Sequence, residues 1–274
     1  MISSKTEHGA VRARSTQVVQ LGQMLLSACS LDEAVDQFYS FLDNDRSGYL
    51  TFLAAHSLTQ ASTDSTFRTI NNNALLSLPD GAPIAWLGRM QGQNSITRVT
   101  GPDFFENILT NKKSANYRHF FYGASEPTLE VLKQKVSRSL GADAVAGSYS
   151  PPIREYGAQE TDEVIAQIES AQPDVIWVGL STPKQEYWLH NHIARFHRRV
   201  IGVGVGAAFD FYSGQFNRAP SWYRDKGFEW LFRLAQEPRR MMPRYLRALP
   251  MLSSLALKVA LERGKSIQKP IQDT

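Results

Sequence analysis

Short apolar runs and stretches of helical periodicity alternate along most of this chain. The apolar runs predict strands over 48–54, 74–78, 117–122, 144–149, 174–180 and 199–205. Apolar residues spaced for one helix face predict helices over 32–42, 56–67, 104–109, 127–140, 159–170 and 181–196, with another beginning near Pro83. This succession is typical of βαβ units, so we expect an α/β fold, a parallel sheet with helices on both faces. The last strand of the series is expected at the end of that sheet.

The two ends of the chain differ from this body. Residues 1–16 are short of large apolar side chains and are predicted to be disordered, whereas 17–30 predict an opening strand or hairpin. Beyond Phe211 the pattern is helical only, with an apolar face that includes Trp222, Trp230 and Leu234 and an interruption at 237–238. We therefore divide the chain into a disordered segment 1–16, an α/β domain 17–214 and a helical appendage 215–274.

Charge separates the appendage from the rest of the chain. Residues 215–274 hold 12 Lys and Arg against 5 Asp and Glu, whereas 1–214 hold 18 against 21. A basic segment attracts phosphate groups, so the candidate partners are nucleic acid, an anionic membrane surface and a substrate that carries a diphosphate. Because the segment is also amphipathic, it is typical of a helix that lies on a membrane surface.

Composition excludes several classes of protein. No apolar run approaches the ~20 residues of a membrane span, and the N-terminus lacks a signal-type apolar core, which predicts a cytoplasmic protein. The single cysteine, Cys29, excludes an internal disulfide and a cysteine-based zinc site and is interpreted as a small buried side chain. The histidines near residue 190 lack the spacing of metal ligands, and a stretch at 43–54 that imitates a calcium loop ends in Ala54 where a glutamate is needed. We predict no metal.

One carboxylate stands where the pattern changes from strand to helix. Asp80 follows an apolar run and Pro79, and Pro83 then suits the first turn of a helix. In a parallel sheet such a turn lies at the carboxyl edge, where ligands bind, so Asp80 would face a cleft with its backbone held by Gly81. The alternative is that Asp80 only caps the N-terminus of the helix.

Two further strand-to-helix turns carry candidate chemistry. Residues 202–207 match the outline Gly-x-Gly-x-x-Ala of the dinucleotide fingerprint of Rossmann-like sheets, and the alternative is that these glycines serve packing. Residues 179–186 offer Ser181 and Thr182 as helix caps and Lys184 and Gln185 as groups within reach of a ligand. Taken alone, this turn is a capping box with a solvated lysine.

These turns belong to an ordered series of motifs: LPDGAP at 78–83, RVTGPD at 98–103, FFYG at 120–123, GSYSPP at 147–152, VGLSTPKQE at 178–186, GVGAAFD at 204–210 and EWLFRLAQEPRR at 229–240. The series resembles the WecG/TagA/CpsF glycosyltransferases over residues 17–249. The resemblance implies an inverting, metal-independent enzyme without a cofactor. Such an enzyme moves a sugar, commonly N-acetylmannosamine or its uronate, from UDP to a saccharide linked to a polyprenyl diphosphate in cell-surface or exopolysaccharide synthesis.

The resemblance also implies partners and a location. The partners are a UDP-sugar donor, a lipid-linked saccharide acceptor and an anionic membrane surface, with no nucleic acid among them. The protein would be cytoplasmic and peripheral to the inner face of the cell membrane, which its C-terminal basic helical appendage contacts. Association into a homo-oligomer stays open, as does the identity of the donor sugar.

Residue roles follow from the same resemblance. Asp80 would be the general base that takes the proton of the acceptor hydroxyl, and Arg233 and Arg240 would neutralise charge on the departing UDP. Gln185 would hold the sugar or the diphosphate. The alternative for the arginines is that they solvate the appendage or contact lipid headgroups. The predicted substrate-binding residues are Thr51, His56, Gly81, Asp103, Gly123, Tyr149, Ser150, Lys184, Gln185, Gly204, Gly206, Asp210 and Arg244.

Two positions depart from the family's pattern, and two other functions stay open. Ala54 stands where the family usually has asparagine, two residues before His56, which removes a polar contact to the substrates. Pro243 occupies a place that is often basic. The first alternative function is an NAD(P)-dependent Rossmann oxidoreductase built on 202–207. The second is a non-catalytic membrane adaptor that uses the basic appendage.

Overall fold

The structure is a computed structural model that describes residues 17–261 apart from 153–156, 221 and 224–228. The segment predicted to be disordered, 1–16, lies outside the described residues. The predicted opening hairpin is present as β1 (Val18–Leu21) and β2 (Met24–Ser27), which pair antiparallel. Each of the other predicted strands is present in one sheet, as β3 (Gly48–Leu53), β4 (Leu76–Pro79), β5 (His119–Gly123), β6 (Val145–Tyr149), β7 (Val175–Gly179) and β8 (Ile201–Gly204).

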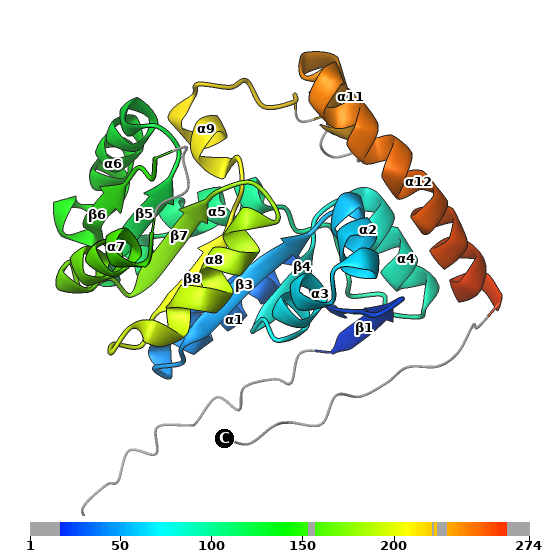
Figure 1. The fold of residues 1–274 in the computed structure, drawn as a ribbon, viewed down its shortest axis with the longest axis horizontal. Coiled ribbons are helices and arrows are strands. Elements are labelled where there is room, and N and C mark those ends of the chain that lie inside the picture. Colours follow the sequence, from blue (N-terminus) through cyan, green and yellow to red (C-terminus); the bar gives the residue numbers. More distant parts are fainter. Residues whose placement is uncertain (1–16, 153–156, 221, 224–228, 262–274) are drawn as a thin grey trace, which may run out of the picture.

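The strands of this sheet are all parallel and lie in the order β4-β3-β8-β7-β5-β6 (Figure 1). β8, the last of them in the sequence, pairs with β3 on one side and β7 on the other. The expectation that it lies at the end of the sheet is therefore wrong, because an apolar run reports burial on both faces but not which strands are its neighbours. The carboxyl ends of β3, β4, β7 and β8 consequently meet at one edge, where open parallel sheets bind ligands.

One face of the sheet is covered by α1 (Leu31–Asp43), α5 (Gly101–Thr110), α6 (Glu126–Leu140) and α9 (Ala208–Ser213). α1 begins with a capping box, in which the Ser30 and Glu33 side chains each accept a hydrogen bond from the other's backbone N–H. In the core below, Phe104 and Phe105 lie with ring centroids 6.4 and 4.9 Å from that of Trp177. Burying such side chains stabilises this layer by about 1.5–3 kcal/mol each.

The other face is covered by α3 (Ser65–Asn72), α7 (Ala158–Ser170) and α8 (Lys184–His192), which confirms the predicted α/β fold with helices on both faces. The single helix predicted over 56–67 is two helices, α2 (Ala55–Thr63) and α3. The break arises because Asp64 ends α2 and caps α3, its Oδ1 accepting a hydrogen bond from the Phe67 backbone N–H at 2.9 Å. The helix predicted over 181–196 begins only after Pro183. Single 3-10 turns occur at η1 (Lys112–Asn116), η2 (Ala142–Ala144) and η3 (Ile193–Arg195).

A third core lies at the β4 end of the sheet, between the hairpin, α2, α4 (Ala82–Met90) and the C-terminal helix α12 (Pro238–Leu261). α12 follows α11 (Glu229–Gln236) and runs beside α2 and α4 (Figure 1). Its Leu255 and Val259 are buried in this core with Leu26 and Leu58. α12 is therefore packed against the α/β body. No helix in the part of the chain described has both the length and the hydropathy to cross a bilayer.

Candidate functional site

The turn after β4 places Asp80 at the carboxyl edge of the sheet. The Asp80 backbone N–H donates to the carbonyl of Leu53 at 2.9 Å, which ties the turn to the end of β3. Gly81 follows with φ of +126°, a conformation that L side chains rarely adopt, and is the N-cap residue of α4, with Pro83 in the first turn. The alternative that Asp80 is itself the N-cap residue is therefore wrong.

Asp80 lines a small hollow of about 150 Å³ at this edge. Its wall is built from the ends of β3, β4, β7 and β8, the first turns of α2, α5, α8 and α9, and one residue of α12. The predicted site residues that line it are His56, Asp80, Gln185, Gly204, Gly206, Asp210 and Arg244. Elements that are distant in the sequence thus bring carboxylates, a glycine-rich strand end and an arginine to one place. The roles assigned to these residues stay predictions.

Gln185 uses its side chain to shape the glycine-rich end of β8. Its Nε2 donates to the Gly204 carbonyl at 3.0 Å, and its Oε1 accepts from the Gly206 backbone N–H at 2.9 Å. The residue is 3% exposed, so these hydrogen bonds are shielded from water. Gln185 therefore holds the turn that lines the hollow, whatever contact it makes with a ligand.

Glu186 contacts two residues that line the hollow, Thr182 and Gln185, and sequence reasoning gave it no role. It is 1% exposed, and its Oε1 accepts hydrogen bonds from the Thr182 hydroxyl at 2.9 Å and from Gln185 Nε2 at 3.2 Å. Burial raises the pKa of its carboxyl above the usual value. The capping box expected for this turn is absent, because the N-cap residue of α8 is Pro183 and Thr182 donates to Glu186 instead. Only the adjacency of a glutamate to Gln185 could have pointed to this role.

The predicted arginines come from the two last helices. Arg244 of α12 lines the hollow and is half-buried. Arg233 lies in α11 and Arg240 in α12, but their side chains lie outside the part of the structure that is described. Among the described residues no group of His, Cys, Asp and Glu has the arrangement of a metal site.

The remaining predicted residues do not line the hollow. Thr51 is fully buried in β3, with its hydroxyl 3.5 Å from that of Ser77. Tyr149 and Ser150 lie at the end of the edge strand β6, five strands away from β4 at about 4.8 Å per strand. The other four are Gly81, Asp103, Gly123 at the end of β5, and Lys184 at the start of α8. The binding roles of these seven residues stay predictions, and none of the seven lines the hollow.

The dinucleotide outline at 202–207 has a packing explanation at its first glycine. A Cβ on Gly202 would lie 2.5 Å from Leu189 Cδ2 and 2.6 Å from Ile193 Cδ1. The absence of a side chain at Gly202 therefore lets α8 and η3 pack on β8. Only Gly204 and Gly206 line the hollow.

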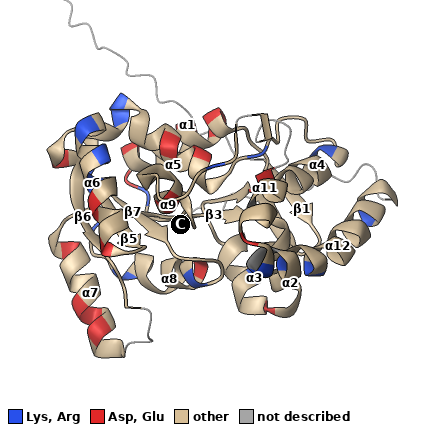
Figure 2. Ribbon diagram, turned by 90° about the horizontal axis from the view of Figure 1, so that it is seen from above, with Lys and Arg blue, Asp and Glu red and all other residues tan. Residues whose placement is uncertain are grey.

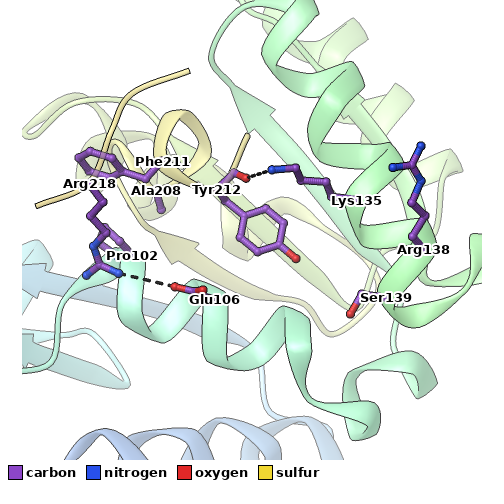
Figure 3. Close-up of a pocket in the computed structure, with 9 residues that line it drawn as sticks. All are labelled: Pro102, Glu106, Lys135, Arg138, Ser139, Ala208, Phe211, Tyr212 and Arg218. Atoms are coloured by element: carbon purple, nitrogen blue, oxygen red, sulfur yellow. Dashed lines mark hydrogen bonds and ion pairs between the residues drawn. The ribbon is translucent and has the colours of Figure 1, made fainter. Parts of the chain in front are cut away.

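A larger crevice of about 660 Å³ lies between α5, α6 and α9 (Figure 3). It shares Pro102 and Phe211 with the hollow, so the two spaces have a common wall. Lys135 donates to the carbonyls of Tyr212 and Ser213 at 2.8 and 3.3 Å, at the C-terminus of α9. A cation at this position offsets the partial negative charge of the helix end.

Comparison with known proteins gives an independent result. The sequence model described as "Glycosyl transferase WecG/TagA/CpsF family" matches residues 19–266. A protein of Bacillus spizizenii is 28% identical over 215 residues, 77% of this chain and 81% of that protein. A protein of Bacillus subtilis is 30% identical over 196 residues, 72% of this chain and 73% of that protein. Both relatives are named N-acetylglucosaminyldiphosphoundecaprenol N-acetyl-beta-D-mannosaminyltransferase.

Proposed function

The chain belongs to the WecG/TagA/CpsF family of glycosyl transferases, and on that premise we propose that it transfers N-acetylmannosamine from UDP to N-acetylglucosamine on undecaprenyl diphosphate. The product would enter the synthesis of a cell-surface polymer. Family membership makes the chain a glycosyltransferase and decides against both the oxidoreductase and the non-catalytic adaptor. The donor and acceptor are inferred from the names of the two relatives.

The observation that carries the proposal is the position of Asp80 in one wall with Gly204, Gly206 and Arg244. In an inverting transfer the acceptor hydroxyl oxygen attacks the anomeric carbon, and the bond from that carbon to UDP breaks as the new bond forms. UDP leaves with the electron pair, and the proton of the hydroxyl passes to Asp80. A positioned carboxylate that acts as general base accelerates such a step by roughly 10²–10⁴-fold.

The negative charge that grows on UDP needs a compensating charge. We assign this role to Arg244, together with Arg233 and Arg240 of the same C-terminal helices, because guanidinium groups bind phosphate oxygens through paired hydrogen bonds. The glycines at the end of β8 leave room for the diphosphate to approach the backbone. In line with the metal-independent transfer that the family resemblance implies, this proposal has the arginines neutralise the leaving group.

The outer face of α12 has the features of a membrane contact, and this supports the proposal that the acceptor is membrane-bound. Its outward apolar side chains are 45–78% exposed and repeat at helical spacing: Met242, Leu246, Leu249, Leu257 and Leu261. We call these residues the apolar stripe. The helix has basic residues and no acidic one, whereas α7 on the far side of the molecule is acidic (Figure 2). An exposed apolar stripe with basic neighbours is typical of a helix that lies in the membrane interface, so we propose a cytoplasmic enzyme peripheral to the inner face of the membrane.

A transfer assay tests the proposal. The purified chain, given UDP-N-acetylmannosamine and a short-chain prenyl-diphosphate N-acetylglucosamine, is expected to release UDP and form the disaccharide, and UDP-glucose and the uronate donor run in parallel. The Asp80→Asn variant should transfer at least about a hundredfold more slowly, with UDP affinity and circular dichroism unchanged. Asp143→Asn, an exposed aspartate in η2, is the matched control and should react at the wild-type rate. Wild-type turnover by Asp80→Asn would refute the assignment of the base.

A further inference from the structure

Two arginines and two carboxylates form a closed, partly buried cluster beside the hollow: Arg98, Asp103, Arg218 and Glu229. Arg218 Nη2 lies 2.7 Å from Asp103 Oδ1, and its Nε lies 3.5 Å from Glu229 Oε1. Arg98 Nη1 lies 3.0 Å from Glu229 Oε2, and its Nη2 lies 3.6 Å from Asp103 Oδ2. Each carboxylate therefore contacts both arginines, and the formal charges of the cluster cancel.

The cluster is buried enough that solvent weakens the attraction between its charges only partly. The side chains of Arg218 and Glu229 are 14% and 13% exposed, so salt screens their attraction less than that of a surface pair. Although burial alone would raise the pKa of Asp103, its hydrogen bond from the Thr100 hydroxyl and the nearby Arg218 guanidinium hold that pKa below the usual value. Asp103 therefore stays ionised inside the cluster. Glu106, which also contacts Arg218, at 3.6 Å, is 58% exposed and lies at its rim (Figure 3).

The cluster joins the wall of the hollow to the C-terminal helices. Arg98 and Asp103 flank Gly101 and Pro102, both of which line the hollow. Glu229 is the first residue of α11. Arg218 lies eleven positions before Glu229 in the sequence. Arg218 contacts Asp103, Glu229 contacts Arg98, and Arg218 and Glu229 contact each other, so the cluster draws the two positions together at the start of α5.

We propose that this cluster positions α11, so that Arg98, Arg218 and Glu229 are positioning residues for sugar transfer. The backbone of Arg233 lies one helical turn after Glu229, so fixing Glu229 fixes the place from which the Arg233 side chain extends. Displacing a catalytic group by about 1 Å can slow a reaction roughly a hundredfold, so the hold on Glu229 matters although none of these three side chains takes part in the chemistry. The inference rests on the proposed transferase function.

The test uses the full chain and two measurements, transfer kinetics and hydrogen exchange of the backbone amides of 229–236. Glu229→Gln and Arg98→Gln each remove one partner of the contact between Arg98 and Glu229, and their double variant completes a thermodynamic cycle. The matched control is Glu106→Gln, which removes an exposed carboxylate that contacts Arg218. Exchange in α7, which packs on the opposite face of the sheet from α5, reports whether each variant is folded.

We expect Glu229→Gln and Arg98→Gln to raise amide exchange in α11 by about tenfold or more and to lower kcat by roughly ten- to a hundredfold. The KM for the donor should change little, and Glu106→Gln should behave as wild type. The effect of the double variant on kcat should be smaller than the product of the two single effects, because both single variants lose the contact between Arg98 and Glu229. Slower transfer with unchanged exchange in α11 would overturn the positioning role, as would faster exchange with unchanged kcat. If the wild-type chain transferred no sugar, the proposed function would fail, and the exchange data would still decide whether the cluster holds α11.

Discussion

The first turn of α2 begins without a side-chain cap, although its N-cap residue lies in the wall of the hollow. Ala54 has the extended backbone of an N-cap residue but no group that can accept a hydrogen bond from the following amides. We predict that Ala54→Asn raises the free energy of unfolding by about 1 kcal/mol, because asparagine is among the best N-cap residues. Urea unfolding measures this, and Ala55→Asn, one position inside the helix, is the matched control. Equal stability of Ala54→Asn and wild type would contradict the prediction.

Glu186 gives the folding stability a dependence on pH. Because burial raises its pKa in the folded state, the folded protein keeps this proton at pH values where the unfolded chain has released it. The free energy of unfolding therefore falls as pH rises from the ordinary glutamate pKa of 4.5 to the folded-state value, and then stays level.

Glu186→Gln should remove this dependence. We predict that the variant becomes more stable relative to wild type as pH rises above 4.5, because it has no proton to lose. Urea unfolding at a series of pH values measures the difference. Glu126→Gln, an exposed position at the start of α6, should follow the wild-type profile. A difference between Glu186→Gln and wild type that is constant with pH would show that the carboxyl does not titrate as inferred.

At the scale of elements, α12 is apolar on two sides, one packed on the body and one facing out. Replacing Leu246, Leu249 and Leu257 of the apolar stripe by Gln should weaken binding to vesicles that contain anionic lipid by at least about tenfold, because these side chains would enter the interface. Their exposure predicts a change in the free energy of unfolding within about 0.5 kcal/mol per substitution. Flotation with the vesicles measures binding, and Val131→Gln on α6, also exposed, is the control. Wild-type binding by the triple variant would rule out the stripe as the membrane contact.

The sequence predicts the type and order of most elements, because the spacing of apolar residues within a short segment shows which of its side chains are buried. It fails where local caps compete with a helix, as at Asp64, and where Pro183 delays the start of α8. It also predicts Asp80 and the glycines of β8 as neighbours, because carboxyl ends of parallel strands share an edge. The sequence does not predict the cluster around Arg218, because its contacts join residues that are distant along the chain. It does not predict the burial of Glu186, because a charged side chain at the start of a helix is ordinarily exposed.

At the scale of the whole molecule, the order of strands is the part of the fold that the sequence pattern does not contain. Apolar runs 48–54 and 199–205 are equally compatible with an edge or a central position once both faces are covered. The structure places them side by side, and this pairing brings Ala54 and His56 into the same wall as Gly204. The site is therefore a product of the sheet order rather than of any single motif.

The central place of β8 also governs how the molecule can be made. β3 with β4, and β5 with β6 and β7, form two groups that only β8 joins within the described sheet. Without β8, the described sheet would divide into two groups of strands, each with an open inner edge of the kind that aggregates. Insertion of β8 closes both edges and adds Gly204 to the wall of the hollow, which α9 and α12 then complete. A premature stop before that strand would leave a fragment for chaperones and proteases instead of a partly active enzyme.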